Sequence, residues 1–450
     1  MKVSKFGGSS VATAEQIKKV LNIINSDDDR RIIIVSAPGK RHSKDTKTTD
    51  LLIRLYEKVT NNLDYQSKKQ EVLDRYQDII DDLELKTNLL EEINQTLEHY
   101  ITSLKNEPER LLDALKSSGE NFNAQLIAAY NNEQGIPTRY LSPKAAGIIV
   151  TDEPENAQIL QSSYDKIKQL RQYNEKIIIP GFFGYSESDY IVTFPRGGSD
   201  ITGAIVARGV KADLYENFTD VSGIYRANPT VISSPEIISE ITYREMRELS
   251  YAGFGVFHDE ALQPLYRYRI PVVIKNTNRP EDPGTYIVHD REINRQRVVT
   301  GISCDKGFTS INIKKYLMNR QVGFTVKILK ILSDNNISFD HMPSGIDNIS
   351  IIMRTSQITG KEQQVLNAIR SECQVDELSV EHDLAILMIV GEGMSALVGT
   401  ANKITDALAQ AHINLKMINQ GSSEISMMFG ISNKDAEAAV KACYTNCYLQ

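Results

Sequence analysis

The chain has 450 residues, of which 41% are hydrophobic and 24% charged, as is typical of a soluble globular protein with two or three domains. Its net charge of −7 argues against a nucleic-acid partner, and no apolar run has the length of a signal peptide or membrane span. The four cysteines form no paired CxxC arrangement, so we expect reduced thiols, no disulfide framework and no protein-held metal. These features predict a cytoplasmic protein that does not contact a membrane.

The first predicted element is a strand from Val3 to Phe6, which is followed by the glycine loop Gly7-Gly8-Ser9-Ser10 and an amphipathic helix. Thr13 and Gln16 have the spacing of a capping box at the helix start. Glycines let backbone N–H groups approach phosphate oxygens, and a helix N-terminus favours negative charge. We therefore predict an anion-binding loop in which Lys5 provides the positive charge.

Through the first 300 residues, short β-branched runs alternate with helical segments. The runs are Arg31–Val35, Ile148–Val150, Ile177–Ile179, Tyr190–Phe194 and Pro271–Ile274. Continuous apolar runs suit strands that are covered on both faces, so the sequence predicts an α/β domain with a mainly parallel sheet. A second loop, Ser36 to Gly39, follows the second strand, and residues 50–130 predict several amphipathic helices.

The last 150 residues contain an internal duplication at an offset of 76 residues. Seven pairs share this offset without a gap: Gly323 with Gly399, Ile328 with Ile404, Leu332 with Leu408, Ile337 with Ile413, Gly345 with Gly421, Ile349 with Ile425 and Ser350 with Ser426. Each copy predicts a strand, a glycine loop, an amphipathic helix and two further strands. We expect a first domain at residues 1–295 and two similar modules at 296–380 and 381–450.

The string from Val3 to Val11 resembles, at every position, the opening signature of the aspartokinases in the amino acid kinase superfamily. Three further segments resemble family motifs: Thr49–Leu52, Ser117–Glu120 and Phe194–Asp200. The motifs of other common phosphate-binding and hydrolytic sites, such as GxxxxGK[ST], HRD, DFG, GxSxG and HExxH, do not occur. The resemblance implies a three-layer α/β/α amino acid kinase fold followed by two ferredoxin-like βαββαβ ACT modules.

The same resemblance implies that ATP phosphorylates the β-carboxylate of L-aspartate, giving 4-phospho-L-aspartate for lysine, threonine and methionine biosynthesis. Lys5 and Asp200 are the expected catalytic residues, with Mg²⁺ carried by the nucleotide phosphates. The residues expected to bind aspartate are Thr49, Glu120, Arg196 and Ser199. Glu120 would neutralise the substrate ammonium and Arg196 would hold a carboxylate.

The nucleotide is expected to contact both glycine loops and the segment Phe218–Tyr225, which resembles the family's adenine-side segment. The named candidates are Lys5, Gly7, Gly8, Ser9, Ser36, Gly39, Thr219, Asp220, Tyr225 and Arg226. The sequence departs from the family pattern at Thr230, where many members have arginine, and at Gly255, where many have lysine. Both departures remove positive charge near the phosphates.

The duplicated tail resembles tandem ACT modules, which implies a feedback-inhibited homodimer, and also allows a tetramer, with effector sites between subunits. Gly323, Ser338 and Asp340 are the expected effector contacts, with lysine as the first candidate effector and threonine as the second. No long C-terminal extension follows, so we expect no fused homoserine dehydrogenase. Two alternatives stay open: a catalytically silent amino-acid sensor, and another carboxylate kinase of the superfamily.

Overall fold

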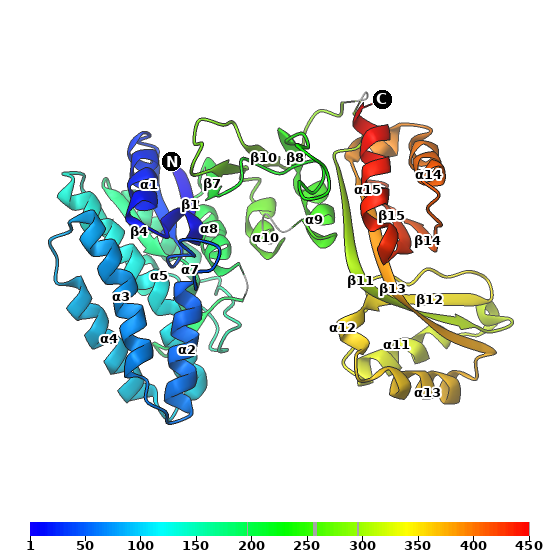
Figure 1. Cartoon of the computed structure of the whole chain (residues 1–450), viewed down its shortest axis with the longest axis horizontal. Coiled ribbons are helices and arrows are strands. Elements are labelled where there is room, and N and C mark those ends of the chain that lie inside the picture. The colour runs from blue at the N-terminus through cyan, green and yellow to red at the C-terminus, as the bar shows by residue number, and fades with distance from the viewer. Residues whose placement is uncertain (196, 255–258, 295–296, 450) are drawn as a thin grey trace. The chain divides into compact units, whose positions relative to one another are not determined.

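The computed structural model describes residues 1–195, 197–254, 259–294 and 297–449, which form two compact units (Figure 1). The first unit contains residues 1–224, 237–243 and 255–291, and the second contains residues 225–236, 244–254 and 292–450. Three segments of the predicted first domain, residues 225–236, residues 244–254 and the residues from 292 onward, therefore group with the tail. The domain limits predicted at 295 and 380 stay a proposal.

An eight-stranded sheet with the order β3-β4-β2-β1-β7-β9-β10-β8 forms the centre of the first unit. Its strands are β1 (Lys2–Phe6), β2 (Arg30–Val35), β3 (Thr138–Tyr140), β4 (Lys176–Pro180), β7 (Leu214–Thr219), β8 (Glu240–Thr242), β9 (Val272–Asn276) and β10 (Thr285–Val288). All neighbouring pairs are parallel except β9 with β10, so the mainly parallel sheet is confirmed.

Two of the predicted strands lie outside this sheet. The run at 190–194 contributes β6 (Ile191–Thr193), which pairs with β5 (Phe183–Tyr185) in a separate antiparallel hairpin. The run at 148–150 forms isolated bridges to Tyr185 and Ile159. Apolar composition predicts that a segment is buried, but it does not specify which strand it pairs with.

Helices cover both faces of the eight-stranded sheet, which gives the expected three layers. One face carries α1 (Ala14–Asn25) and α5 (Pro108–Glu133), and the other carries α8 (Gly198–Gly209). The helices predicted for residues 50–130 are α2 (Thr48–Thr60), α3 (Gln66–Leu83), α4 (Leu89–Leu104) and α5, whose apolar sides share one core with α1. The remaining helices of this unit are α6 (Pro143–Ala146), α7 (Ser163–Ile167) and α10 (Asp259–Arg267).

The side chains of the central strands alternate between these two layers. Phe6 and Phe218 point into the α1–α5 core, where their rings stack with centroids 4.8 Å apart. Lys5 and Asn217, one residue earlier in each strand, therefore face α8. This alternation places polar groups of β1 and β7 beside the start of α8.

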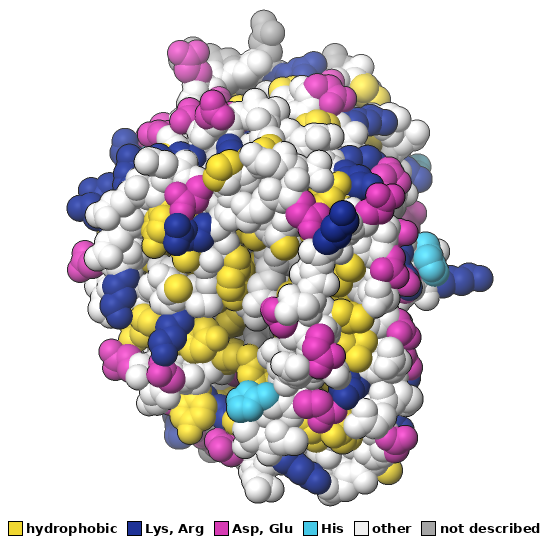
Figure 2. Space-filling model, turned by 90° about the vertical axis from the view of Figure 1, so that its left-hand side faces the viewer, with side chains coloured by type: hydrophobic (Ala, Val, Ile, Leu, Met, Phe, Trp, Pro, Cys, Tyr) yellow, Lys and Arg dark blue, Asp and Glu magenta, His cyan; other side chains and the backbone are white. Residues whose placement is uncertain are grey.

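Charged side chains of both signs are mixed on the face shown in Figure 2, and hydrophobic side chains gather in a central band. Interspersed charges are typical of a solvent-facing protein surface. Within the described part of the chain, none of the helices combines the length and the apolar character needed to cross a membrane.

The second unit contains a five-stranded antiparallel sheet with the order β12-β11-β13-β15-β14. Its strands are β11 (Gly301–Lys314), β12 (Asn348–Arg354), β13 (Glu377–Val390), β14 (Met417–Gln420) and β15 (Ser426–Ser432). Its helices are α9 (Tyr243–Tyr251), α11 (Phe324–Asp334), α12 (Thr355–Ile358), α13 (Glu362–Cys373), α14 (Thr400–Gln410) and α15 (Ala436–Tyr444).

The two sequence repeats share the long strands β11 and β13. The first half of β11 pairs with the second half of β13, and the other two halves pair with each other beside β12. Each repeat keeps its own hydrophobic core, one around α11 and α13 and the other around α14 and α15. A linear cut at 380/381 therefore passes through β13.

The repeated glycines have the same structural role. Gly323 and Gly399 precede α11 and α14 with φ values of 81° and 95°, in the left-handed region that favours glycine. The repeat in the sequence thus corresponds to a repeated helix start.

Candidate functional site

A buried ion pair lies between β1 and the first turn of α8. Lys5 Nζ is 2.7 Å from Asp200 Oδ1, and both residues are less than 10% exposed. Because Asp200 lies in the first turn of α8, the helix dipole also favours its negative charge. The two residues expected to be catalytic are thus brought together.

The two glycine loops contact each other beside this pair. Gly39 N–H donates to Gly8 O at 2.9 Å, and a Cβ added at Gly39 would lie 2.6 Å from the Gly8 carbonyl carbon. A Cβ at Gly7 would lie 3.6 Å from Lys5 Nζ, so the ammonium lies directly against the first loop. The predicted anion-binding loops and Lys5 therefore form one continuous site.

Buried polar atoms without partners lie near the second loop. Glu120 Oε2, Asn123 Oδ1 and Thr48 Oγ1 are buried and have no hydrogen-bond partner among the described residues. Asn123 Nδ2 donates to Ser36 O at 2.7 Å, which ties α5 to this loop. Burial raises the pKa of Glu120 to about 8, and a backbone hydrogen bond with Ala37 acts in the opposite direction. A cationic ligand group would satisfy this carboxyl and favour its ionised form.

The other residues expected to bind aspartate have different surroundings. Thr49 is half-buried in the first turn of α2, beside the fully buried Thr48. Ser199 is buried in the first turn of α8, where Gly181 approaches it so closely that an added Cβ would lie 2.7 Å from Ser199 Oγ. Arg196 lies outside the described residues.

The nucleotide-side residues are divided between the units. Thr219 ends β7 and donates to Asp220 Oδ1 at 3.1 Å. Tyr225 and Arg226 belong to the second unit, where Arg226 Nε is 3.2 Å from Glu236 and Arg226 Nη1 donates to Thr300 O at 3.1 Å. Their nucleotide role stays a prediction.

The two positions that depart from the family pattern add no positive charge. Thr230 is exposed, and both its N–H and its hydroxyl donate to Asn228 Oδ1. Gly255 lies outside the described residues.

The three residues expected to bind an effector lie in the second unit. Gly323 begins α11, and Ser338 N–H donates to Gln357 Oε1 at 3.3 Å. The Asp340 carboxylate accepts a hydrogen bond from the Tyr251 hydroxyl, so one of its oxygens already has a partner.

Sequence reasoning missed Asn217, Asn123 and Thr48. Asn217 is 2% exposed, and its Nδ2 donates to Asp200 Oδ1 at 3.0 Å. The available signal was the pair Glu216-Asn217, because two successive polar residues are unusual in a strand covered on both faces.

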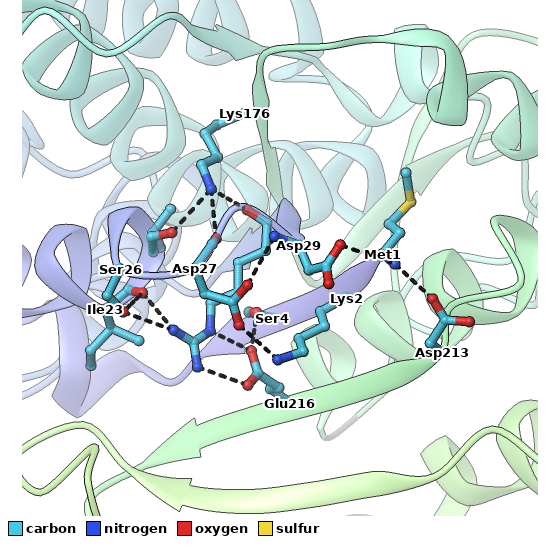
Figure 3. Close-up of polar contacts among 12 residues, drawn as sticks. Met1, Lys2, Ser4, Ile23, Ser26, Asp27, Asp29, Lys176, Asp213 and Glu216 are labelled. Carbon is cyan, nitrogen blue, oxygen red and sulfur yellow. Dashed lines mark hydrogen bonds and ion pairs between the residues drawn. The ribbon is translucent and has the colours of Figure 1, made fainter.

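The opposite face of the same strands carries a second buried network (Figure 3). Glu216 accepts hydrogen bonds from Arg30 Nε at 2.7 Å and Arg30 Nη2 at 3.0 Å, and from Ser4 Oγ at 2.7 Å. The remaining Arg30 nitrogen, Nη1, donates to Ile23 O at 2.7 Å. These groups bond one another, so we interpret the network as structural.

The four cysteines (Cys304, Cys373, Cys443 and Cys447) are free thiols, in agreement with the sequence prediction. Burial raises the pKa of Cys304 to about 12, so this thiol is protonated at neutral pH. Among the residues that the structure describes, no three His, Cys, Asp or Glu side chains form a group that could hold a metal ion.

The chain is similar to known proteins over almost its whole length. The model of the amino acid kinase family matches residues 1–276, and an ACT domain model matches residues 387–446. Aspartokinase 3 of Bacillus subtilis is 49% identical over 445 residues, which cover 99% of this chain and 98% of that protein.

Two solved structures also match the whole chain. The crystal structure of Clostridium acetobutylicum aspartate kinase, described as an allosteric enzyme, has a TM-score of 0.87 at 41% identity and covers 99% of this chain and 100% of its own. Escherichia coli aspartokinase III in complex with aspartate and ADP has a TM-score of 0.78 at 25% identity, with 100% of both chains covered.

Proposed function

The chain belongs to the amino acid kinase family as one of its aspartokinases, and on this premise we propose how its residues phosphorylate L-aspartate. The observation that carries the proposal is the Lys5–Asp200 pair against two touching glycine loops. The backbone N–H groups of Gly8 and Ser9, at the start of the short helix Gly8–Val11, bind the ATP phosphates. The N–H groups of Gly7 and Gly39 instead hold the loops in place, because they donate to Phe218 O at 3.1 Å and to Gly8 O at 2.9 Å. Lys5 follows the γ-phosphoryl group and neutralises the charge that develops on it.

The acceptor is held on the α5 side of the site. Glu120 pairs with the α-ammonium of aspartate, which supplies the partner that its buried carboxyl oxygen lacks. Thr49 and Ser199 donate hydroxyl hydrogen bonds, and Arg196 grips a carboxylate in a bidentate arrangement. The β-carboxylate is thereby directed toward the γ-phosphate.

No general base is needed in this reaction, because a β-carboxylate with a pKa of about 3.9 is already ionised at neutral pH. Its oxygen forms a bond to the γ-phosphorus while the bond from that phosphorus to the β,γ-bridging oxygen breaks. The electron pair leaves on ADP, and the product is 4-phospho-L-aspartate. The nucleotide enters as its Mg²⁺ complex, in which phosphate oxygens and water hold the ion and lower the repulsion between the two anions.

The second unit is proposed to bind the inhibitory amino acid at Gly323, Ser338 and Asp340. Lysine is the first candidate, because an acidic residue suits its second ammonium group, and threonine is the second. The proposed assembly is a homodimer through the ACT modules, with a tetramer as the further possibility. The cytoplasmic location stays a prediction.

ADP release with L-aspartate and then with L-glutamate tests this function against its alternatives. We expect turnover with aspartate and a product that hydroxylamine traps as the hydroxamate. Turnover with glutamate alone would indicate another carboxylate kinase. Tight lysine binding without any turnover would indicate a silent sensor.

A further inference from the structure

Asn217 is a buried amide in contact with both members of the catalytic ion pair. Its Nδ2 donates to Asp200 Oδ1 at 3.0 Å, and its Oδ1 accepts from Lys5 Nζ at 3.5 Å. Because Lys5 Nζ is itself 2.7 Å from Asp200 Oδ1, the three groups form a closed triangle. A buried side chain with both of its polar atoms in this triangle is positioned to fix the other two.

The position of Asn217 follows from strand register. Lys5 and Asn217 are direct partners in the parallel pair β1–β7, and both side chains point toward α8. Asp200 reaches the same layer from the first turn of α8. Asn217 thus links the element that carries the cation to the element that carries the anion.

The chemistry of a carboxamide suits this role. It donates to the carboxylate and accepts from the ammonium while adding no charge. A carboxylate at this position would repel Asp200 and attract Lys5 away from a phosphate. A leucine would fill the space but leave both ions free to rotate.

We propose that Asn217 is a positioning residue for phosphoryl transfer, which holds the Asp200 carboxylate so that the Lys5 ammonium points toward the phosphate. This inference rests on the proposed function. Two of the three Lys5 N–H groups are used within the triangle, and the third has no partner among the described residues. That N–H is available to the transferring group.

The test compares kcat and KM in Asn217→Leu, Asn217→Asp and the control Ser4→Ala. Ser4 precedes Lys5, and its buried hydroxyl bonds Glu216 on the opposite face, so its removal disturbs the same strand pair without touching the triangle. We expect kcat to fall about 10-fold to 100-fold in Asn217→Leu, with KM for aspartate within about twofold. Ser4→Ala is expected to keep kcat within about twofold.

Two readouts separate positioning from a merely structural role. When Asp200 is already replaced by Asn, adding Asn217→Leu should lower kcat by a further factor of less than about three. The group that Asn217 orients has already changed in that background. In Asn217→Asp, kcat relative to the parent should rise as pH falls, because the protonated carboxyl can again donate to Asp200.

Unchanged kcat in both Asn217 variants, or an equal loss with and without the Asp200 change, would overturn the inference. If Asn217→Leu does not fold, the pH profile of Asn217→Asp tests the inference: a relative kcat that does not rise as pH falls would contradict it. A parent enzyme that turns over glutamate instead of aspartate contradicts the proposed function, while the ratios between variants still test Asn217. With an inactive parent, a crystal structure of Asn217→Asp in which Asp200 and Lys5 keep their positions would refute it.

Discussion

The strands β1 and β7 each contribute one residue to a buried ion pair, and the two pairs lie on opposite faces of the sheet. Toward α8, Lys5 lies 2.7 Å from Asp200, and toward α1, Arg30 lies 2.7 Å from Glu216. The side chains of both pairs are at most 12% exposed. Distance and burial therefore do not distinguish them.

The two ion pairs differ in how many of their hydrogen-bonding groups still lack a partner. Arg30 and Glu216 form two parallel bonds, and Ser4 Oγ donates to the same Glu216 oxygen that accepts from Arg30 Nε. The third guanidinium nitrogen, Arg30 Nη1, donates to Ile23 O. Lys5 instead keeps one N–H without a partner among the described residues and lies against a glycine loop. A saturated buried pair stabilises the fold, whereas an unsaturated one beside a glycine loop is available to a ligand.

The largest expected effect comes from removing the unsaturated cation. Lys5→Ala should lower kcat roughly 1,000-fold, because a charge that stabilises the transferring phosphoryl group is lost. Lys2→Ala is the control, since Lys2 lies on the same strand and pairs with Asp27 at 2.7 Å. Both variants are assayed by ADP release and checked by circular dichroism, and near-normal turnover in Lys5→Ala would refute its role.

Breaking the saturated pair should affect stability instead of chemistry. Glu216→Gln leaves the buried Arg30 cation without its counter-charge, which is expected to cost about 3 kcal/mol in the free energy of unfolding. The kcat of the folded fraction should stay within about twofold of the parent. Denaturant unfolding measures the free energy of unfolding. Active-site titration gives the concentration of folded enzyme that is needed to calculate kcat. A large loss of kcat in correctly folded enzyme would contradict the structural interpretation.

Glu120 tests whether a buried carboxyl oxygen that lacks a hydrogen-bond partner in the described part of the chain also marks a ligand-binding position, as proposed for the Lys5 ammonium. Its raised pKa, about 8 instead of 4.5, means that the empty folded enzyme binds this proton more tightly than the unfolded chain does. Stability should therefore fall as pH rises from about 4.5 to about 8, and Glu120→Gln should remove this slope.

The same shift predicts the pH dependence of substrate binding. Pairing with an ammonium requires ionised Glu120, so KM for aspartate should fall as pH rises from 7 toward 8. In Glu120→Gln, this KM should be about 10-fold to 100-fold higher at pH 8. Thermal melts at several pH values measure the effect on stability. Pre-steady-state aspartate binding and KM at the same pH values measure the effect on substrate binding. A pH-independent KM in the parent would count against the assigned role.

The smallest effect is expected in the second unit, where the predicted effector residue Asp340 is already bonded by Tyr251. Partial burial and the Asp340 carboxylate raise the pKa of Tyr251, so its hydroxyl stays a donor at neutral pH. Tyr251→Phe should free the carboxylate and strengthen inhibition by lysine about twofold to fivefold. Activity titrations with lysine and threonine measure this change. Weaker inhibition would mean that the Tyr251 contact supports the effector site instead of competing with it.

The sequence was informative where a signal lies within a few consecutive residues. Thr13 caps the helix start, with Gln16 N–H donating to Thr13 Oγ1 at 3.3 Å, but the predicted capping box is only half formed. The Gln16 side chain donates to Asn278 Oδ1 at 3.1 Å, and its Oε1 accepts no hydrogen bond among the described residues. The glycine loops, the helices of residues 50–130 and the repeated glycine before α11 and α14 were also evident from local pattern. The resemblance to a family supplied the roles of Glu120 and Arg196, which spacing alone does not.

Tertiary structure decided which distant residues meet. Neighbours in a parallel sheet are set by the order of crossovers, so Lys5 and Asn217 lie side by side although 212 residues separate them. For the same reason, the sequence does not predict the Arg30–Glu216 pair or the sharing of β11 and β13 between the two repeats. By itself the sequence determined where the chain turns and which faces are buried, since those depend on local sterics and periodicity. The partners across the sheet follow only from the complete packing.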